Sequence, residues 1–430
     1  MHPASLEILR ARIKPLSAVR PLGRVRRIHE DRIVVGGLDR AARLGDEVVC
    51  CGTDGPLRAE VVALGEGGVE AMPYASLDGL GLGAEVVVAG PATIAPADGW
   101  LGRIVDPFGA PLDGRPLTEG APRPIRAAPP PAGRRGGFGA RLATGYVALD
   151  TLLPVAEGQR MGVFAGSGVG KSRLLGDLAR DMEADVVVAA LIGERGREVS
   201  SFARDAVGAA MARTVVVAAT SDRPAGVRRR ALPAAIAVAE RFRACGARVL
   251  FVCDSLTRHA EACRDVAGAR GEGVAMPPSL VSELAACLER IGPGADREPA
   301  ITAVLTVLVA GSDMEEPLAD AVRGLLDGHV VLSRAVAEAG RFPAIDPLAS
   351  VSRSLPEAAT NEENATIART RALLEAYARS ELMVTAGLYD AGRDPALDEA
   401  IRLRPKVLDA LAARAGTPAD SFVLLRRALG

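Results

Sequence analysis

Short apolar runs alternate with segments of helical periodicity in the middle of the chain. Between residues 159 and 354 the runs stand at 161–165, 186–192, 214–219, 249–253, 301–309 and 329–332. Continuous runs of this kind are typical of strands buried on both faces of a parallel sheet, with helices covering those faces. The pattern therefore predicts an α/β domain with a mainly parallel sheet over residues 141–358.

The flanking regions follow other patterns. Residues 23–100 contain short β-prone pieces separated by Gly and Asp-Gly turns, which predicts a small β-barrel. Residues 359–430 place apolar side chains three and four positions apart among Arg and Glu, which predicts a helical domain. The stretch 101–140 is rich in Pro, Gly and Arg, so we expect a linker that leads into the α/β domain.

A glycine-rich loop follows the first apolar run. Residues 165–172 read Ala-Gly-Ser-Gly-Val-Gly-Lys-Ser and precede a helical segment, an order typical of a Walker A phosphate loop, with Ala165 where the strict pattern has Gly. Glycines let successive N–H groups point at phosphate oxygens, and the helix N-terminus adds its positive dipole end. Lys171 is expected to reach the β- and γ-phosphates, and the Ser172 hydroxyl to bind Mg²⁺. The predicted nucleotide-binding residues here are Ala165, Gly166, Ser167, Gly168, Val169, Gly170, Lys171, Ser172 and Arg173.

Two carboxylates stand where predicted strands end. Asp254 follows the run 249–253, and Glu194 follows 186–192 after one glycine. The carboxyl ends of parallel strands share one sheet edge, where open α/β folds bind ligands, so both acids are expected beside the phosphate loop. Asp254 is the candidate for completing the Mg²⁺ shell, and Glu194 for polarising the attacking water. The predicted chemistry is hydrolysis of ATP to ADP and phosphate.

Composition narrows the classes of function. Basic and acidic side chains number 52 and 53, for a net charge of −1, so the chain lacks the positive charge that would attract nucleic acid. Aromatic residues make up only 3%, too few for a base-stacking surface. Both observations disfavour a nucleic-acid translocase. The six cysteines and four histidines do not have the spacing of a zinc site. We expect the cysteines to be free thiols in a reducing cytosol. Arginine clusters such as 228–230 are expected to form solvated surface.

Four segments together resemble the ATPases of type III protein export. They are Gly-Glu-Arg-Gly-Arg-Glu (193–198), Asp-Ser-Leu-Thr-Arg (254–258), Asp-Gly-His-Val-Val-Leu-Ser-Arg (327–334) and Phe-Pro-Ala-Ile-Asp-Pro-Leu-Ala-Ser-Val-Ser-Arg (342–353). The likeness extends from about Gly23 to near the C-terminus and is closest to the flagellar branch, as judged by residues 101–106. These ATPases in turn resemble the catalytic subunits of rotary ATP synthases. The resemblance implies a RecA-like P-loop ATPase core.

The resemblance also implies roles for individual residues. It makes Glu194 the water-activating acid and Asp254 the magnesium-side aspartate. It makes Arg353 a finger that reaches the γ-phosphate bound by the neighbouring subunit, which requires an oligomer. The other implied nucleotide contacts are Arg195, Arg258, Phe342 and Tyr389, the last two on the two faces of adenine.

The implied function is export of flagellar components, powered by ATP hydrolysis in a hexameric ring. Implied partners are an export regulator or stator, a stalk-like coupling protein, chaperone–cargo complexes and the membrane export gate, with a cytoplasmic location at the inner membrane and no nucleic acid. Leu6, Leu9 and Ile13 recur at helical spacing in the N-terminal arm, 1–22, which is a candidate for docking to the regulator or the membrane. A virulence-type secretion ATPase and a rotary synthase catalytic subunit remain alternatives. A non-catalytic ring subunit is disfavoured because Glu194 is present.

Overall fold

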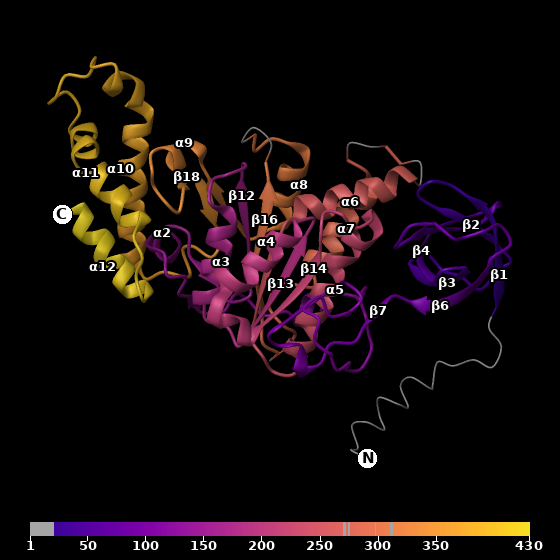
Figure 1. Cartoon of the computed structure of the whole chain (residues 1–430). Helices are drawn as coiled ribbons and strands as arrows, with labels where there is room; N and C mark the ends of the chain where they lie inside the picture. The colour runs from indigo at the N-terminus through magenta and orange to yellow at the C-terminus, as the bar shows by residue number, and fades with distance from the viewer. Residues whose placement is uncertain (1–20, 270–271, 274–275, 297, 310–312) are drawn as a thin grey trace.

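Three parts follow one another along the molecule in the computed structural model: a barrel, a central α/β domain and a group of helices (Figure 1). The structure describes residues 21–430 except 270–271, 274–275, 297 and 310–312. The barrel lies at the indigo end of the picture and the helices at the yellow end. Residues 1–20 of the predicted N-terminal arm lie outside the described residues.

Six strands close the N-terminal barrel in the order β1-β2-β5-β4-β3-β6. They are β1 (Leu22–Ile28), β2 (Ile33–Gly36), β3 (Asp46–Gly52), β4 (Gly55–Gly65), β5 (Gly68–Pro73) and β6 (Glu85–Pro91). Their inward side chains form a small core of their own, which includes Ile33, Val48, Val61, Val69 and Val86. Closure leaves no strand edge unpaired, so short strands suffice. The predicted barrel is confirmed.

The central sheet has eight strands in the order β18-β17-β12-β16-β15-β13-β14-β8. They are β8 (Arg103–Val105), β12 (Arg160–Ala165), β13 (Val186–Ile192), β14 (Thr214–Ala219), β15 (Val249–Asp254), β16 (Ile301–Leu308), β17 (Gly328–Leu332) and β18 (Ile345–Ser352). All pairs are parallel except β17 with β18. The predicted mainly parallel sheet is confirmed, and β8 adds an edge strand from within the expected linker. Two short pairs complete the strands: β7 (Thr93–Ile94) with β9 (Arg123–Pro124), and β10 (Arg141–Leu142) with β11 (Val155–Ala156).

Helices cover both faces of this sheet. Successive residues of a strand point to opposite sides, so an all-apolar strand needs a core on each face. In β13, Val186, Val188 and Ala190 belong to one core, while Val187 and Ala189 belong to the other. The first core is covered by α5 (Ala225–Ala244), α6 (Leu256–Ala269), α7 (Pro278–Leu288) and α8 (Pro317–Leu325). The second is covered by α2 (Val147–Thr151), α3 (Lys171–Asp181) and the C-terminal helices. The short helices α4 (Gly196–Ser201) and α9 (Arg334–Glu338) follow β13 and β17.

The C-terminal part consists of α10 (Asn361–Thr385), α11 (Pro395–Ala412) and α12 (Pro418–Leu429), as predicted. Each begins at a residue whose side chain accepts a hydrogen bond from a free N–H of the first turn: Thr360, Asp394 and Thr417. Thr360 and Glu363 form a capping box. Local sequence therefore fixes where these helices start.

Two arginines of the cluster 228–230 are buried, so the prediction of a solvated face is wrong for them. Arg229 binds Glu60 of the barrel at 3.0 Å and Glu283 of α7 at 2.6 Å. Burial alone would raise the pKa of Glu283, but the Arg229 guanidinium helps to lower it to about 2. Arg230 is 2% exposed, pairs with Glu47 of the barrel and packs over an aromatic ring at 4.4 Å. Buried ion pairs therefore join the barrel to the α/β domain.

One buried cluster combines residue types that bind metals. His259, Cys263 and Glu283 place their ligand atoms within 4.8 Å of one another. Both oxygens of Glu283 accept hydrogen bonds from Arg229, whose positive charge opposes a cation at this point. We therefore treat the cluster as part of the buried charge network.

Candidate nucleotide-binding site

The glycine-rich loop joins β12 to α3 at the carboxyl edge of the sheet. β12 ends at Ala165, and α3 begins at Lys171. Gly168 and Gly170 have φ angles of +79° and +88°, in the left-handed region that glycine enters without steric cost. The chain can therefore turn tightly into the first turn of α3, where free N–H groups and the positive end of the helix dipole favour an anion.

Three polar side chains converge on Asp254, which is 3% exposed at the end of β15. Lys171 Nζ donates to Asp254 Oδ1, and Ser172 Oγ lies 3.5 Å from Oδ2. Thr306 Oγ1 on the neighbouring strand β16 donates to Oδ1 at 2.8 Å. The structure thus brings Lys171, Ser172 and Asp254 together as expected and adds Thr306. The only sequence signal for Thr306 was a polar residue within an apolar run.

The oxygens at this point suit a magnesium ion. Mg²⁺ prefers hard oxygen ligands, keeps several waters and takes few ligands from the protein. The Ser172 hydroxyl and the Asp254 carboxylate supply such oxygens beside the loop that would bind the phosphates. These two residues would hold the ion together with the nucleotide.

Glu194 stands at the same edge, after β13 and the turn residue Gly193. Gly193 has φ +71°, and a Cβ on it would lie 3.0 Å from the Cβ and Cγ of Arg258, so a glycine is required there. Glu194 lines a cavity of about 350 Å³ together with Ser172, Asp254 and Glu198 among others. Burial, then the Asp254 carboxylate and a hydrogen bond with Glu198, raise the pKa of Glu194 to about 7.

Three neighbours surround Glu194. Glu198 accepts a hydrogen bond from the backbone N–H of Arg195 at 3.2 Å, which holds the start of α4, and sequence reasoning did not single it out. The Arg195 side chain is exposed. Arg258 Nη1 donates to Glu261 at 2.9 Å, and this bond raises the pKa of Arg258. Arg258 therefore lies at the phosphate edge, the carboxyl edge of the sheet that carries the glycine-rich loop, and its hydrogen bond to Glu261 orients its guanidinium.

A second cavity, of about 450 Å³, also lies at the start of α3, and Arg173 lines both cavities. Phe342 is half-exposed and rests against the loop, since a Cβ on Gly170 would lie 3.3 Å from its ring. Arg414, which sequence reasoning missed, packs its guanidinium 4.3 Å from the centre of the Tyr146 ring. The cavity is lined by Tyr146, Gly170, Arg173, Leu174, Asp177, Arg180, Phe342, Pro343, Ala412 and Arg414. Its position beside the phosphate loop and its aromatic wall suit the base of a nucleotide.

Tyr389 is not brought to this cavity. It lies in the connection between α10 and α11, where its hydroxyl bonds to the Asp398 carboxylate at 3.0 Å and accepts from the Asp394 N–H at 3.1 Å. The tyrosine thus holds the tip of the helical hairpin (Figure 1). Within one protomer it does not cover the base face opposite Phe342.

Arg353 lies at the opposite edge of the sheet from its own phosphate loop. Ala165, at the loop, pairs with Leu332 of β17, and Leu332 pairs with Ile345 at the start of β18. Because β18 is antiparallel, its other end, Ser352, pairs with Gly328 at the far edge. The register shifts between His329 and Val331, so β18 runs alongside only the four steps of β17 from Leu332 to Gly328, which span about 13 Å. The exposed Arg353 therefore cannot reach the loop of its own chain.

Known proteins contain the same two domains in the same order along the chain. Residues 145–352 match the nucleotide-binding domain of the ATP synthase alpha/beta family, and residues 359–421 match the T3SS EscN ATPase C-terminal domain. The flagellum-specific ATP synthase of Caulobacter vibrioides is 44% identical over 388 residues, which cover 87% of this chain and 86% of the relative. The chain belongs to the type III secretion and flagellar export ATPases of the ATP synthase alpha/beta family.

Secretion and flagellar members of this ATPase family are similar to the chain to a comparable degree. The SPI-2 type 3 secretion system ATPase of Salmonella typhimurium is also 44% identical, with 84% of each chain covered. The assembled ATPase EscN in complex with its central stalk EscO, from the enteropathogenic E. coli type III secretion system, has a TM-score of 0.84 at 36% identity. That comparison covers 95% of this chain and 100% of the EscN chain.

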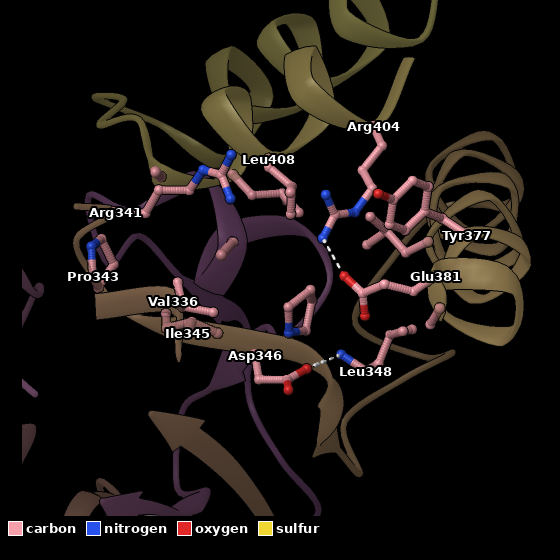
Figure 2. A pocket seen from close by; sticks show the side chains of 16 residues that line it. Val336, Arg341, Pro343, Ile345, Asp346, Leu348, Tyr377, Glu381, Arg404 and Leu408 are labelled. Atoms are coloured by element: carbon pink, nitrogen blue, oxygen red, sulfur yellow. Dashed lines mark hydrogen bonds and ion pairs between the residues drawn. The ribbon is translucent and has the colours of Figure 1, made fainter. Parts of the chain in front are cut away.

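The C-terminal domain of this export ATPase meets the nucleotide-binding domain at a third cavity, of about 190 Å³ (Figure 2). Leu408 and Tyr377 enter it from the C-terminal helices, and Arg341 and Pro343 from the loop before β18. Arg404 lies 4.1 Å from the centre of the Tyr377 ring and pairs with a glutamate of α10. Pro343 lines both this cavity and the one at Phe342, so the loop that carries Phe342 is held between the nucleotide side and the C-terminal helices.

Proposed function

We propose that this export ATPase hydrolyses ATP at the interfaces of a hexameric ring and thereby powers the export of flagellar components. The observation that carries the proposal is the position of Arg353, which lies about 13 Å along the sheet from the edge that carries the phosphate loop. Each protomer then has a surface that binds the nucleotide and a second surface that completes the site of a neighbour. A ring is the closed assembly that such a head-to-tail contact can form.

The proposed mechanism is phosphoryl transfer to water. The loop and Lys171 bind the phosphates, and Ser172 and Asp254 hold the magnesium ion, which neutralises charge on the phosphate oxygens when bound. Glu194 accepts a hydrogen bond from the attacking water, which requires its ionised form. Arg353 of the neighbouring protomer stabilises the charge that develops as the γ-phosphoryl departs.

A solved structure of a relative supports one of the proposed partners. EscN was solved with its central stalk EscO, which supports a stalk-like coupling protein here. An export regulator or stator, chaperone–cargo complexes and the membrane export gate complete the proposed set, at the cytoplasmic face of the inner membrane and without nucleic acid. None of the helices in the described part of the chain has the length and hydropathy of a membrane span.

The flagellar branch is our choice over the virulence branch because residues 101–106 resemble it most, whereas a flagellar and a secretion relative are equally similar to the chain, at 44% identity. The secretion-type C-terminal domain over residues 359–421 disfavours a rotary synthase subunit. Complementation separates the two export branches: the gene is expressed in Caulobacter vibrioides without its flagellum-specific ATP synthase and in Salmonella typhimurium without its SPI-2 ATPase. We expect motility to return in the first host. Restored secretion in the second host alone would assign the virulence branch.

Turnover of the purified protein tests the interfacial site. Specific activity is measured against protein concentration, with sedimentation to record assembly. We expect activity to rise as rings form, Lys171→Ala to lose nucleotide binding, and Glu194→Gln to bind ATP without turnover. Full activity in a protein that stays monomeric contradicts sites shared between protomers.

A further inference from the structure

The proposed base cavity has an arginine facing it from the first turn of α3. Arg173 lines the same cavity as Phe342 and stands three residues beyond Gly170, against which the Phe342 ring rests. Arg173 and Phe342 thus both line this cavity at the start of α3, and Arg173 also lines the neighbouring cavity of Glu194.

Arg173 differs from the other arginines of this cavity because its side chain has no partner. Arg180 binds Asp177 and Asp181 at 2.7 and 2.8 Å, and Arg414 binds the same two carboxylates. The Arg173 side chain is exposed and forms no ion pair or hydrogen bond with any other residue that the structure describes. It is the guanidinium at this cavity that remains available to a ligand.

The position of Arg173 is unfavourable for the helix that carries it. The N-terminus of a helix is the positive end of its dipole, where acidic side chains stabilise and basic ones destabilise. The first turn of α3 contains no acidic residue to offset the charge. A basic side chain at this position without a counterion does not stabilise the fold. Contact with a bound nucleotide would explain why an arginine stands there.

We propose that Arg173 covers the face of the nucleotide base opposite Phe342, a place for which Tyr389 was the expected residue. The inference rests on the proposed nucleotide site and adds a residue that grips the base. A guanidinium is planar and weakly hydrated, so it stacks on an aromatic face, whereas an ammonium is a compact, strongly hydrated charge. The base would then lie between a ring and a guanidinium.

Two ligands separate a contact to the base from a contact to the phosphates. Binding of the non-cleavable analogue AMP-PNP and of inorganic tripolyphosphate, each with Mg²⁺, is measured by calorimetry for the wild type, Arg173→Ala and Arg173→Lys. We expect both variants to weaken AMP-PNP binding roughly 3- to 30-fold. Tripolyphosphate binding should change by less than about twofold, because that ligand has no base.

Other outcomes overturn the inference in distinguishable ways. An equal loss for both ligands in Arg173→Ala, rescued by Arg173→Lys, assigns the side chain to a phosphate. No change for either ligand makes it a surface residue. Tyr389→Ala is the matched control, and a loss of AMP-PNP binding confined to that variant returns the role to Tyr389. Lys171→Ala must weaken both ligands, and if it weakens neither, the proposed nucleotide site itself is wrong. The melting temperature of ligand-free Arg173→Ala should equal or exceed that of the wild type.

Discussion

Mixing two inactive variants tests whether one protomer completes the site of the next. Arg353→Ala keeps the phosphate loop and loses the finger, and Lys171→Ala keeps the finger and loses the loop lysine. Arginine fingers contribute 10³ to 10⁵ in rate, which corresponds to about 4 to 7 kcal/mol of transition-state stabilisation. Each variant alone is therefore expected to show almost no turnover.

The recovered activity can be worked out from the fold. Arg353 lies about 13 Å along the sheet from the edge that carries its own phosphate loop, so each proposed site would combine one protomer's loop with another's finger. In rings assembled from equal amounts of the two variants, an interface is competent when an Arg353→Ala protomer supplies the loop and a Lys171→Ala protomer supplies the finger. For random assembly this holds for about one quarter of the interfaces.

The assay follows phosphate release after the variants are mixed at low concentration and then concentrated to form rings. Co-purification through a tag on one variant shows that the rings are mixed. Lys171→Ala mixed with the double variant Lys171→Ala/Arg353→Ala is the matched control, since those rings contain no intact loop. If rings that demonstrably contain both single variants stay inactive, the idea of a finger acting between protomers is refuted.

Three further predictions rest on single residues. The raised pKa of Glu194 means that its carboxylate is lost as pH falls, so kcat/KM for ATP should decline below about pH 7, and a flat profile from pH 6 to 8 removes Glu194 as the water-orienting group. Phe342→Ala should raise KM for ATP roughly 5- to 100-fold with a small change in kcat, because base stacking is lost; an unchanged KM excludes the stack. Arg230→Ala should lower the free energy of unfolding by about 3–5 kcal/mol in denaturant melts, because Glu47 keeps only the more exposed Arg58 as a partner and the carbonyls of Thr93 and Pro107 lose a buried donor. The exposed pair of Arg24 with Glu85 is the control, and Arg24→Ala should change stability by less than about 1 kcal/mol.

The phosphate edge could be predicted from sequence because its geometry follows from chain order. A parallel strand delivers the residue after it to the carboxyl edge, so Asp254 and Glu194 could be placed beside the loop from their positions after apolar runs. The strands themselves were visible because burial on both faces demands continuous apolar runs. Strand β18 lacked that signal, since it is an edge strand with exposed positions and contains Pro347, which edge strands tolerate.

What could not be predicted depends on partners far away in the sequence. Arg229 and Arg230 look like any surface cluster, and only folding brings them to Glu60 and Glu47, more than 160 residues earlier. A charge is buried only where such partners are present, so exposure cannot be read from charge alone. The family resemblance named Tyr389 by its motif, but the loop between α10 and α11 sets it against Asp398 instead.

The segment 342–353 explains how neighbouring sites can be coupled. It begins with Phe342 beside its own phosphate loop and ends with Arg353 at the opposite edge of the same sheet. Because β18 runs antiparallel to its neighbour, one continuous strand joins a residue that would contact one nucleotide to a residue that would act on the next. Close-packed protein interiors transmit strain, so a displacement at one end of this segment can reach the other. The C-terminal helices contact the same segment at Pro343, so a partner that moves those helices would act on both sites through a single strand.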